Sequence, residues 1–211
     1  MSYNPNLHHR RSIRLKGYDY SQAGAYFITI CCHNRKCLFG EIAVGAGAAV
    51  GAGASPAPTA LMTLNKFGQI AYNEWIKLTE RFENFELDVF QIMPNHIHGI
   101  IVLNNVGTTL AVTQNNGNNQ TDIGADIVSN IRAGASPPPM NATISDIVGA
   151  YKSLVANGCL EIYKSKNETM GKLWQRNYHE HIIRNEQSYQ TISNYIINNP
   201  AKWNGDKFYI Q

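Results

Sequence analysis

The sequence predicts one α+β domain in which helices pack on a mostly antiparallel sheet. Three observations favour this fold class. Segments with the alternation or β-branched content of strands are interleaved with segments whose apolar residues recur every three to four positions, as in helices. Two of the expected strands are separated by only a short turn, which is typical of antiparallel pairing. The chain of 211 residues is long enough for one such domain with a sizeable core.

The first half of the chain predicts a strand, a helix and a hairpin. Residues 25–33 form a strand because they are aromatic and β-branched. Residues 64–82 form a helix with one apolar stripe, which consists of Phe67, Ile70, Ala71, Trp75, Leu78 and Phe82. Residues 85–92 and 96–103 form two strands of a hairpin that turns around Pro94–Asn95.

The second half adds a helix, an extended segment and a last helix. Residues 144–155 are amphipathic, residues 172–184 read as extended, and residues 185–200 form the last helix. Asn185 is its expected N-cap and Pro200 its expected stop. The order strand, helix, hairpin, helix, strand, helix favours an α+β sandwich.

Two segments depart from this pattern. Residues 43–60 carry no charge and consist almost entirely of Gly, Ala, Pro and Val, whereas residues 104–142 are rich in Asn, Gly and Thr. Neither can bury much apolar surface, so we expect flexible low-complexity insertions within a single domain spanning 1–211. Extra loop length of this kind costs little stability.

Charge and cysteine usage exclude little. The formal net charge of +3 is mild, although basic residues gather in the first twenty positions and in 164–184. Such clusters can contact phosphates, but a solvated surface is the commoner role. No stretch approaches the roughly 20 apolar residues of a membrane helix, and we see no export signal. The four cysteines lack paired C-x-x-C spacing, so we expect reduced thiols in a cytoplasmic protein without membrane contact.

A pair of histidines stands in the most apolar stretch of the chain, "PNHIHGII". Residues two apart in a strand share a face, so His96 and His98 point one way and Ile97 the other. Two such imidazoles can bind one divalent ion if a third ligand arrives from elsewhere. Two partly exposed strand histidines remain the alternative. His179 and His181 have the same spacing, but Glu180 between them would point into an apolar layer, which makes them the weaker pair.

The last helix offers a nucleophile and a ligand. Tyr195 and Asn199 are four positions apart and therefore lie on one helical face. From spacing alone, Tyr195 could equally be a core residue with its hydroxyl directed outward. An Asn directly ahead of a helix-ending Pro, as Asn199 is ahead of Pro200, is more often a helix terminator than a ligand.

Four motifs in order resemble those of a known family. "RSIRLKGYDYSQAGAYFITICCHNRKCLFGEI", "MPNHIHGII", "LWQRNYHEHIIR" and "YIINNP" are similar to the single-tyrosine HUH transposases, and most to the REP-associated tyrosine transposases. The resemblance covers the chain apart from the two insertions. It implies a ferredoxin-like fold with the HUH pair on a central strand. It also implies that His96, His98 and Asn199 bind the metal and that Tyr195 is the nucleophile.

The activity implied by the resemblance is the cleavage and rejoining of single-stranded DNA through a 5′-phosphotyrosine intermediate. The implied cofactor is Mg²⁺ or Mn²⁺, and the implied partner is single-stranded or hairpin-forming DNA. Plausible backbone contacts are Arg10, Arg11, Arg14, Lys16, Arg176 and Arg184. Plausible stacking platforms are Tyr18, Tyr20 and Trp174.

Several alternatives stay open at this point. Tyr178 is the second choice for the nucleophile, ahead of Tyr151 and Tyr163. A domesticated relative could recognise hairpin DNA without cutting it, and an unrelated metal hydrolase could use the same histidines. The protein could act as a monomer or as a homodimer.

Overall fold

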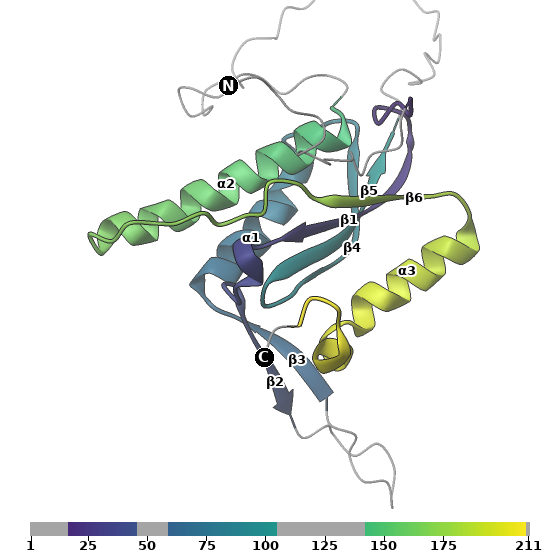
Figure 1. Cartoon of the computed structure of the whole chain (residues 1–211). Helices are drawn as coiled ribbons and strands as arrows, with labels where there is room; N and C mark the ends of the chain where they lie inside the picture. Colours follow the sequence, from purple (N-terminus) through teal and green to yellow (C-terminus); the bar gives the residue numbers. More distant parts are fainter. Residues whose placement is uncertain (1–16, 46–58, 105–141, 210–211) are drawn as a thin grey trace, which may run out of the picture.

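A four-stranded antiparallel sheet forms the centre of the molecule (Figure 1). The computed structural model describes residues 17–45, 59–104 and 142–209. The strands lie in the order β4-β5-β1-β6. Their bounds are β1 Gly24–Cys31, β4 Phe85–Ile92, β5 His96–Leu103 and β6 His179–Ile183. The predicted hairpin of β4 and β5 is confirmed, and β5 is an interior strand.

The helices cover both faces of this sheet, α1 and α2 on one side and α3 on the other (Figure 1). Their bounds are α1 Lys66–Ile76, α2 Ile144–Ser165 and α3 Glu186–Asn198. Short 3₁₀ turns follow β1 (η1, His33–Arg35), α1 (η2, Lys77–Glu80) and α3 (η3, Pro200–Gly205). The α+β sandwich predicted from the sequence is therefore confirmed.

Each α-helix begins at a side chain that accepts from its free amides. Asn65 Oδ1 accepts from the amides of Phe67 and Gly68, and Asn185 Oδ1 accepts from Ser188 N at 2.8 Å. Thr143 and Asp146 form a reciprocal capping box at the start of α2. Such caps are each worth about 1 kcal/mol, and Asn185 is the cap that the sequence predicted.

The helix expected over 64–82 is shorter, because Leu64 belongs to β3 and α1 ends at Ile76. Two other boundaries also differ from the sequence expectation. Helix α2 continues well past residue 155 to Ser165, because its buried stripe extends to Cys159. Gly158 lets α2 approach α1 closely, since a Cβ there would lie 2.8 Å from Ile70 Cγ2. In the segment 172–184, only His179–Ile183 is a strand, preceded by an isolated bridge between Cys32 and Trp174.

The expected insertion at 43–60 is partly regular structure. β2 (Gly40–Gly45) and β3 (Thr59–Leu64) form a separate two-stranded antiparallel sheet, so both ends of this segment are strand. Gly and Ala are poor strand formers, and backbone pairing with β3 overrides that preference. Residues 46–58 lie outside the described part of the chain. The second expected insertion ends before Ala142, which is fully buried and bonded through its backbone to Asn84; its interior, 105–141, is also outside.

The core lies between the sheet and the helices α1 and α2. β1 and β5 direct Tyr26, Ile28, Ile97 and Ile101 toward it, and all four are fully buried. The adjacent residues Cys31 and Cys32 belong to clusters on opposite faces, and both are free thiols. This alternation leaves the second face of β5 available for other chemistry.

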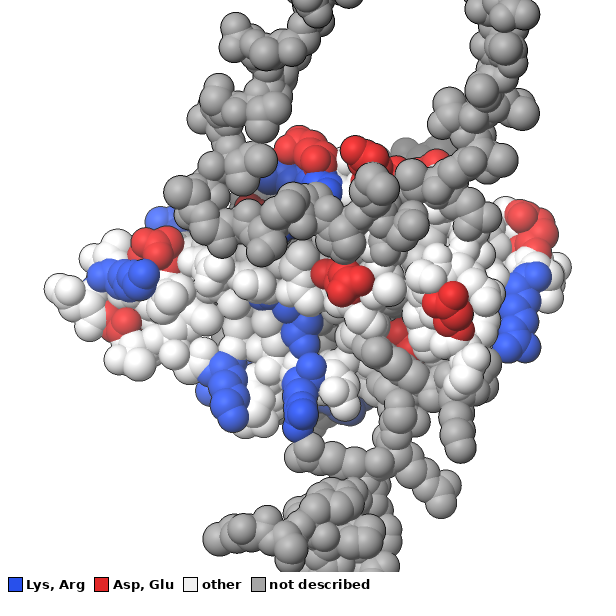
Figure 2. Space-filling view, turned by 90° about the horizontal axis from the view of Figure 1, so that it is seen from above, with Lys and Arg blue, Asp and Glu red and all other residues white. Residues whose placement is uncertain are grey.

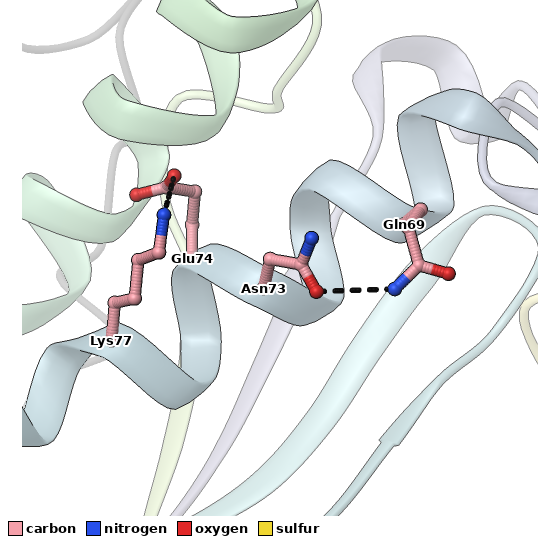
Figure 3. A network of polar contacts seen from close by, with 4 residues as sticks. All are labelled: Gln69, Asn73, Glu74 and Lys77. Carbon is pink, nitrogen blue, oxygen red and sulfur yellow. Dashed lines mark hydrogen bonds and ion pairs between the residues drawn. The ribbon is translucent and has the colours of Figure 1, made fainter.

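The surface offers little that identifies a partner. Helix α1 carries a polar network in which Gln69 Nε2 donates to Asn73 Oδ1 and Lys77 pairs with Glu74 (Figure 3). Pairs of this spacing stabilise a helix by a few tenths of a kcal/mol. Figure 2 shows basic and acidic side chains together on one face, in keeping with the mild net charge. Within the described ranges, no helix is both long and apolar enough to cross a membrane.

Two glycine substitutions should have opposite effects on stability. A Cβ at Gly99 would lie 2.5 Å from Trp75 Cζ2, so Gly99→Ala should lower the free energy of unfolding by about 1–3 kcal/mol through overpacking. A Cβ at Gly149, on exposed α2 surface, would meet nothing within 4 Å. Gly149→Ala should therefore raise that free energy by about 0.5–1 kcal/mol. Urea unfolding of both variants checks the pair, and equal effects would contradict this packing.

Candidate active site

The two histidines of β5 lie on the face of the sheet opposite the main core. Ile97 packs into the core, whereas His98 points toward Tyr195 of α3 and His96 toward Phe208 near the C-terminus. Their exposed fractions are only 0% and 1%, so these are buried imidazoles. The face predicted from period two is the one observed, but the partial exposure considered for bland strand histidines is absent.

Each imidazole is oriented by a hydrogen bond at Nδ1. His96 Nδ1 lies 2.8 Å from Asn95 Oδ1, and His98 Nδ1 lies 2.8 Å from Thr29 Oγ1. The Asn95 amide is itself fixed, because its Nδ2 donates to the carbonyls of Arg35 and Phe208. Asn95 Oδ1 can only accept, so His96 carries its proton on Nδ1 and its lone pair on Nε2. Bonds of this kind set the ring orientation of metal-binding histidines.

Burial keeps both imidazoles neutral. Burial, with smaller contributions from the positive charges of Lys207 and Arg35, lowers the pKa of His96 to about 3. Burial also lowers the pKa of His98 well below its usual value, with a smaller contribution from His96. The neutral form is the one that binds metals. At neutral pH each ring therefore already has one nitrogen with a free lone pair, and for His96 this nitrogen is Nε2.

Helix α3 is anchored to the sheet at a bulge in β4. The register of β4 against β5 shifts between Leu87 and Phe90. Asp88, in this bulge, accepts a hydrogen bond from the Tyr189 hydroxyl at 2.6 Å. Ile196, about two turns further along α3, is fully buried. These two contacts fix the face of α3 that is turned toward the histidines.

Tyr195 and Asn199 come from that face. The Tyr195 hydroxyl lies 3.2 Å from His98 Nε2, while the Tyr195 ring stays partly exposed. Asn199 is 1% exposed, and its Oδ1 has no hydrogen-bond partner. His96 Nε2 is also buried without a partner. Buried polar atoms are normally paired, so this imidazole nitrogen and this amide oxygen are free to bind a further group, such as a cation.

Asp206 is a site residue that the sequence reasoning missed. Its Oδ2 accepts hydrogen bonds from the Tyr195 hydroxyl at 3.3 Å and from Asn199 Nδ2 at 2.9 Å. His96, His98 and Asp206 each offer a ligand atom, and these atoms lie within 4.8 Å of one another, so the group could hold a metal ion. One signal was available, because Asp206 is the sole carboxylate side chain after Glu186.

The competing tyrosines are engaged elsewhere. Tyr151 is fully buried and donates to the Ala71 carbonyl. Tyr163 stacks on Phe67 with ring centroids 5.6 Å apart. The Tyr178 hydroxyl lies 3.2 Å from Ser145 Oγ. The structure thus brings Tyr195, rather than these three, to the histidine pair.

The second histidine pair lies on the edge strand β6, where His179 and His181 are exposed. Glu180 between them is paired in register with Ile28, on the core side, as the period-two argument expected. Across the described residues, neither histidine belongs to a cluster of three groups that could hold a metal.

Two of the six predicted DNA-backbone contacts lie within the described residues. Four of them, Arg10, Arg11, Arg14 and Lys16, lie outside the described residues, whereas Arg176 and Arg184 are exposed. The Trp174 indole donates to the Lys152 carbonyl and packs 5.4 Å from Phe39. Tyr18 and Tyr20 pack together against the core cluster. These three aromatic rings have structural contacts that account for them.

The arrangement defines a class: an α+β domain in which an interior strand carries two histidines and a helix brings a tyrosine to them. A solved structure described as a REP-associated tyrosine transposase bound to a REP hairpin is similar, with a TM-score of 0.51, 18% identity, and 92% of this chain and 76% of that chain covered. At this identity the likeness concerns the fold, and it confirms the predicted fold class.

Two further comparisons concern a relative with high sequence identity and a solved structure with low identity. A Haemophilus influenzae protein described as uncharacterized is 38% identical over 209 residues, which cover 99% of this chain and 97% of that protein. The chain therefore belongs to the same family as this Haemophilus protein. A candidate transposase from Deinococcus radiodurans is 15% identical with a TM-score of 0.37, covering 88% of this chain and 95% of that one. No protein-family model matches the chain.

Stability should fall in mild acid because of the buried histidines. Between about pH 6.5, the ordinary value, and the folded-state pKa of about 3, the unfolded chain binds a proton at His96 that the folded chain does not. The free energy of unfolding should thus fall as the pH drops below about 6.5, by up to about 1.4 kcal/mol per pH unit for each buried histidine.

Urea unfolding in EDTA at about pH 7.5 and about pH 5.5 measures this loss. His96→Asn should remove about half of it, because His98 still contributes. His179→Asn, on the exposed edge strand, is the control and should retain the full loss. An identical loss in His96→Asn would contradict the assignment.

Proposed function

We propose that the protein is a metal-dependent single-tyrosine DNA transposase that cuts and rejoins single-stranded DNA. One observation carries the proposal: the Tyr195 hydroxyl lies 3.2 Å from His98 Nε2, beside the unpaired atoms His96 Nε2 and Asn199 Oδ1. This arrangement supports Tyr195 as the nucleophile beside a set of metal ligands. The fold likeness to a transposase bound to a hairpin supports DNA as the partner.

The proposed metal ligands are His96, His98 and Asn199, and the Asp206 carboxylate is a further oxygen ligand. Two imidazole nitrogens with amide and carboxylate oxygens suit Mn²⁺ and, less well, Mg²⁺. When bound, the cation would polarise the scissile phosphate and stabilise the charge that develops on it. The Nδ1 bonds to Asn95 and Thr29 hold both imidazoles in the orientation that this requires.

Tyr195 is protonated at neutral pH in this environment. Burial, together with the charge and the hydrogen bond of Asp206, raises the pKa of Tyr195 to about 12. Its proton must leave as the hydroxyl oxygen attacks, and Asp206 Oδ2 is already in hydrogen-bond contact with it at 3.3 Å. The site therefore pairs a weak nucleophile with an acceptor for its proton.

The reaction conserves the phosphodiester bond energy. The Tyr195 oxygen bonds to phosphorus as the bond to the 3′ oxygen breaks, and the departing strand takes up a proton as a free 3′-hydroxyl. The other strand end stays attached as a 5′-phosphotyrosine. Attack by a second 3′-hydroxyl on that phosphorus reforms a phosphodiester and returns the phenol, so no nucleotide cofactor is required.

Covalent trapping tests the nucleophile. The full chain, incubated with Mn²⁺ and a pool of hairpin-bearing single-stranded oligonucleotides, should give a protein–DNA adduct on a denaturing gel. Tyr195→Phe removes the attacking oxygen and should abolish the adduct. Tyr178→Phe is the matched control and should retain it.

Three outcomes would redirect the assignment. A persistent adduct with Tyr195→Phe would reject Tyr195. DNA binding by the wild-type chain without any adduct would favour a non-cutting hairpin-binding protein. Strand cleavage unchanged by Tyr195→Phe would favour a metal hydrolase that uses the same histidines.

Metal binding can be measured without activity. A ligand that binds only the folded state raises the free energy of unfolding by about 2.7 kcal/mol at one hundred times its Kd, so Mn²⁺ should raise Tm and EDTA should reverse the rise. His96→Asn should lose most of this shift. His181→Asn, an exposed control, should keep it, and equal loss in both would contradict the proposed ligand set.

A further inference from the structure

Two basic side chains flank the histidine pair without a carboxylate partner. The Arg35 guanidinium carbon and the Lys207 Nζ lie 5.3 Å and 4.9 Å from the centroid of the Phe208 ring. That ring lies 4.6 Å from the His96 ring. Ion pairs with carboxylates in the described part of the chain involve Lys77 and Lys164, not these two cations. Neither cation is therefore held in an ion pair with a carboxylate in the described part of the chain.

The backbone at Arg35 adopts a conformation that is unfavourable for its residue type. Asn34 and Arg35 have φ values of 54° and 53°, in the left-handed region that residues with a Cβ seldom enter. Such outliers persist only where the surroundings impose them, and they gather at functional sites. Here the left-handed conformation determines where the arginine side chain leaves the backbone.

The same turn is bonded to the residue that orients His96. Asn95 Nδ2 donates to the Arg35 carbonyl at 3.0 Å, while Asn95 Oδ1 accepts from His96 Nδ1. Arg35 N donates to the Cys32 carbonyl at 3.0 Å at the end of β1. The position of Arg35 is thus coupled to that of the imidazole by two consecutive hydrogen bonds.

The side chain of Arg35 keeps most of its donors for a ligand. Its Nη1 donates to the backbone carbonyl of Lys207 at 3.0 Å, which ties the arginine side chain to the segment that carries the lysine. A guanidinium has five N–H donors in a planar fork that matches phosphate oxygens, and an ammonium adds a compact point charge. Both side chains are exposed, so an anion can reach them from solvent.

We propose that Arg35 and Lys207 form a phosphate clamp that holds the backbone of the DNA strand next to the scissile phosphate. This inference rests on the proposed function, because the ligand is the phosphodiester chain that Tyr195 attacks. The Arg35 guanidinium binds a phosphate with two N–H donors, and Lys207 supplies the second positive charge. Both contacts ignore base identity, so the clamp positions the strand without reading its sequence.

The salt dependence of binding tests the clamp. The probe is a labelled oligothymidylate of about 20 nucleotides, a length that spans one or more single-strand sites, and binding to the full chain is followed by anisotropy over a range of NaCl concentrations. Tyr195→Phe serves as the background, so no cleavage interferes. Each phosphate contact to a single strand contributes about 0.7 to the slope of log K against log salt.

Arg35→Gln and Lys207→Gln should each weaken binding and reduce that slope by about 0.7, and the double variant by about 1.4. Lys36→Gln and Lys202→Gln are matched controls, one beside each site residue, and both should keep the parent slope. Arg35→Lys retains the charge but not the fork, so it should keep the slope and bind more weakly. Circular dichroism and Tm of the Arg35 variants show whether the fold survives substitution at this turn.

The outcomes separate the two proposals. Unchanged slopes in Arg35→Gln and Lys207→Gln, with the Tyr195 adduct intact in the wild-type chain, overturn the clamp alone. Slope losses equal to those of the Lys36 and Lys202 controls do the same. Reduced slopes without any adduct support the clamp and reject the nuclease chemistry. Absence of salt-dependent DNA binding overturns both.

Discussion

The hydrogen bonds of the buried Asn95 side chain connect the parts of the site that sequence separates most widely. Its carbonyl oxygen orients His96, and its amide nitrogen donates to the carbonyls of Arg35 and Phe208. One amide thus joins the β4–β5 turn, the end of β1 and the C-terminal residues. Loss of any of these bonds would leave a buried polar group without a partner and lower the free energy of unfolding by about 1–3 kcal/mol. The interaction fixes the turn, the tautomer and the neighbouring cations together.

Burial acts in opposite directions on the acid–base groups of this site. It lowers the pKa of both histidines and raises that of Tyr195, because in each case it disfavours the charged form. The imidazoles are left as neutral electron-pair donors and the phenol as a proton carrier. Asp206 accepts from the phenol and from the Asn199 amide, so it supplies negative charge where burial has removed the other charges. The same buried setting therefore keeps both the proposed metal ligands and the proposed nucleophile uncharged.

The sequence was informative wherever a periodic pattern determined direction. Period two placed His96 and His98 on one face, and helical spacing put Tyr195 and Asn199 on another that meets it. Asp206 could not be predicted as a site residue, because it follows a 3₁₀ turn after the last helix, where no periodicity indicates the direction of a side chain. The β2–β3 strands escaped because their Gly- and Ala-rich ends do not read as strand, although the backbone ladder forms. Arg35 escaped because a left-handed conformation at a non-glycine residue leaves no trace in composition.

The residue between the two histidines follows a different rule from its neighbours. Ile97 is fully buried in the main core, on an interior strand paired on both sides. A polar residue there would have to be buried without a partner, whereas a volume-conserving aliphatic swap costs less than about 1.5 kcal/mol. The "U" of an H-U-H motif is thus a packing requirement and takes no part in the chemistry. Variation at this position should follow the shape of the core, whereas the two histidines beside it are constrained by the proposed metal site.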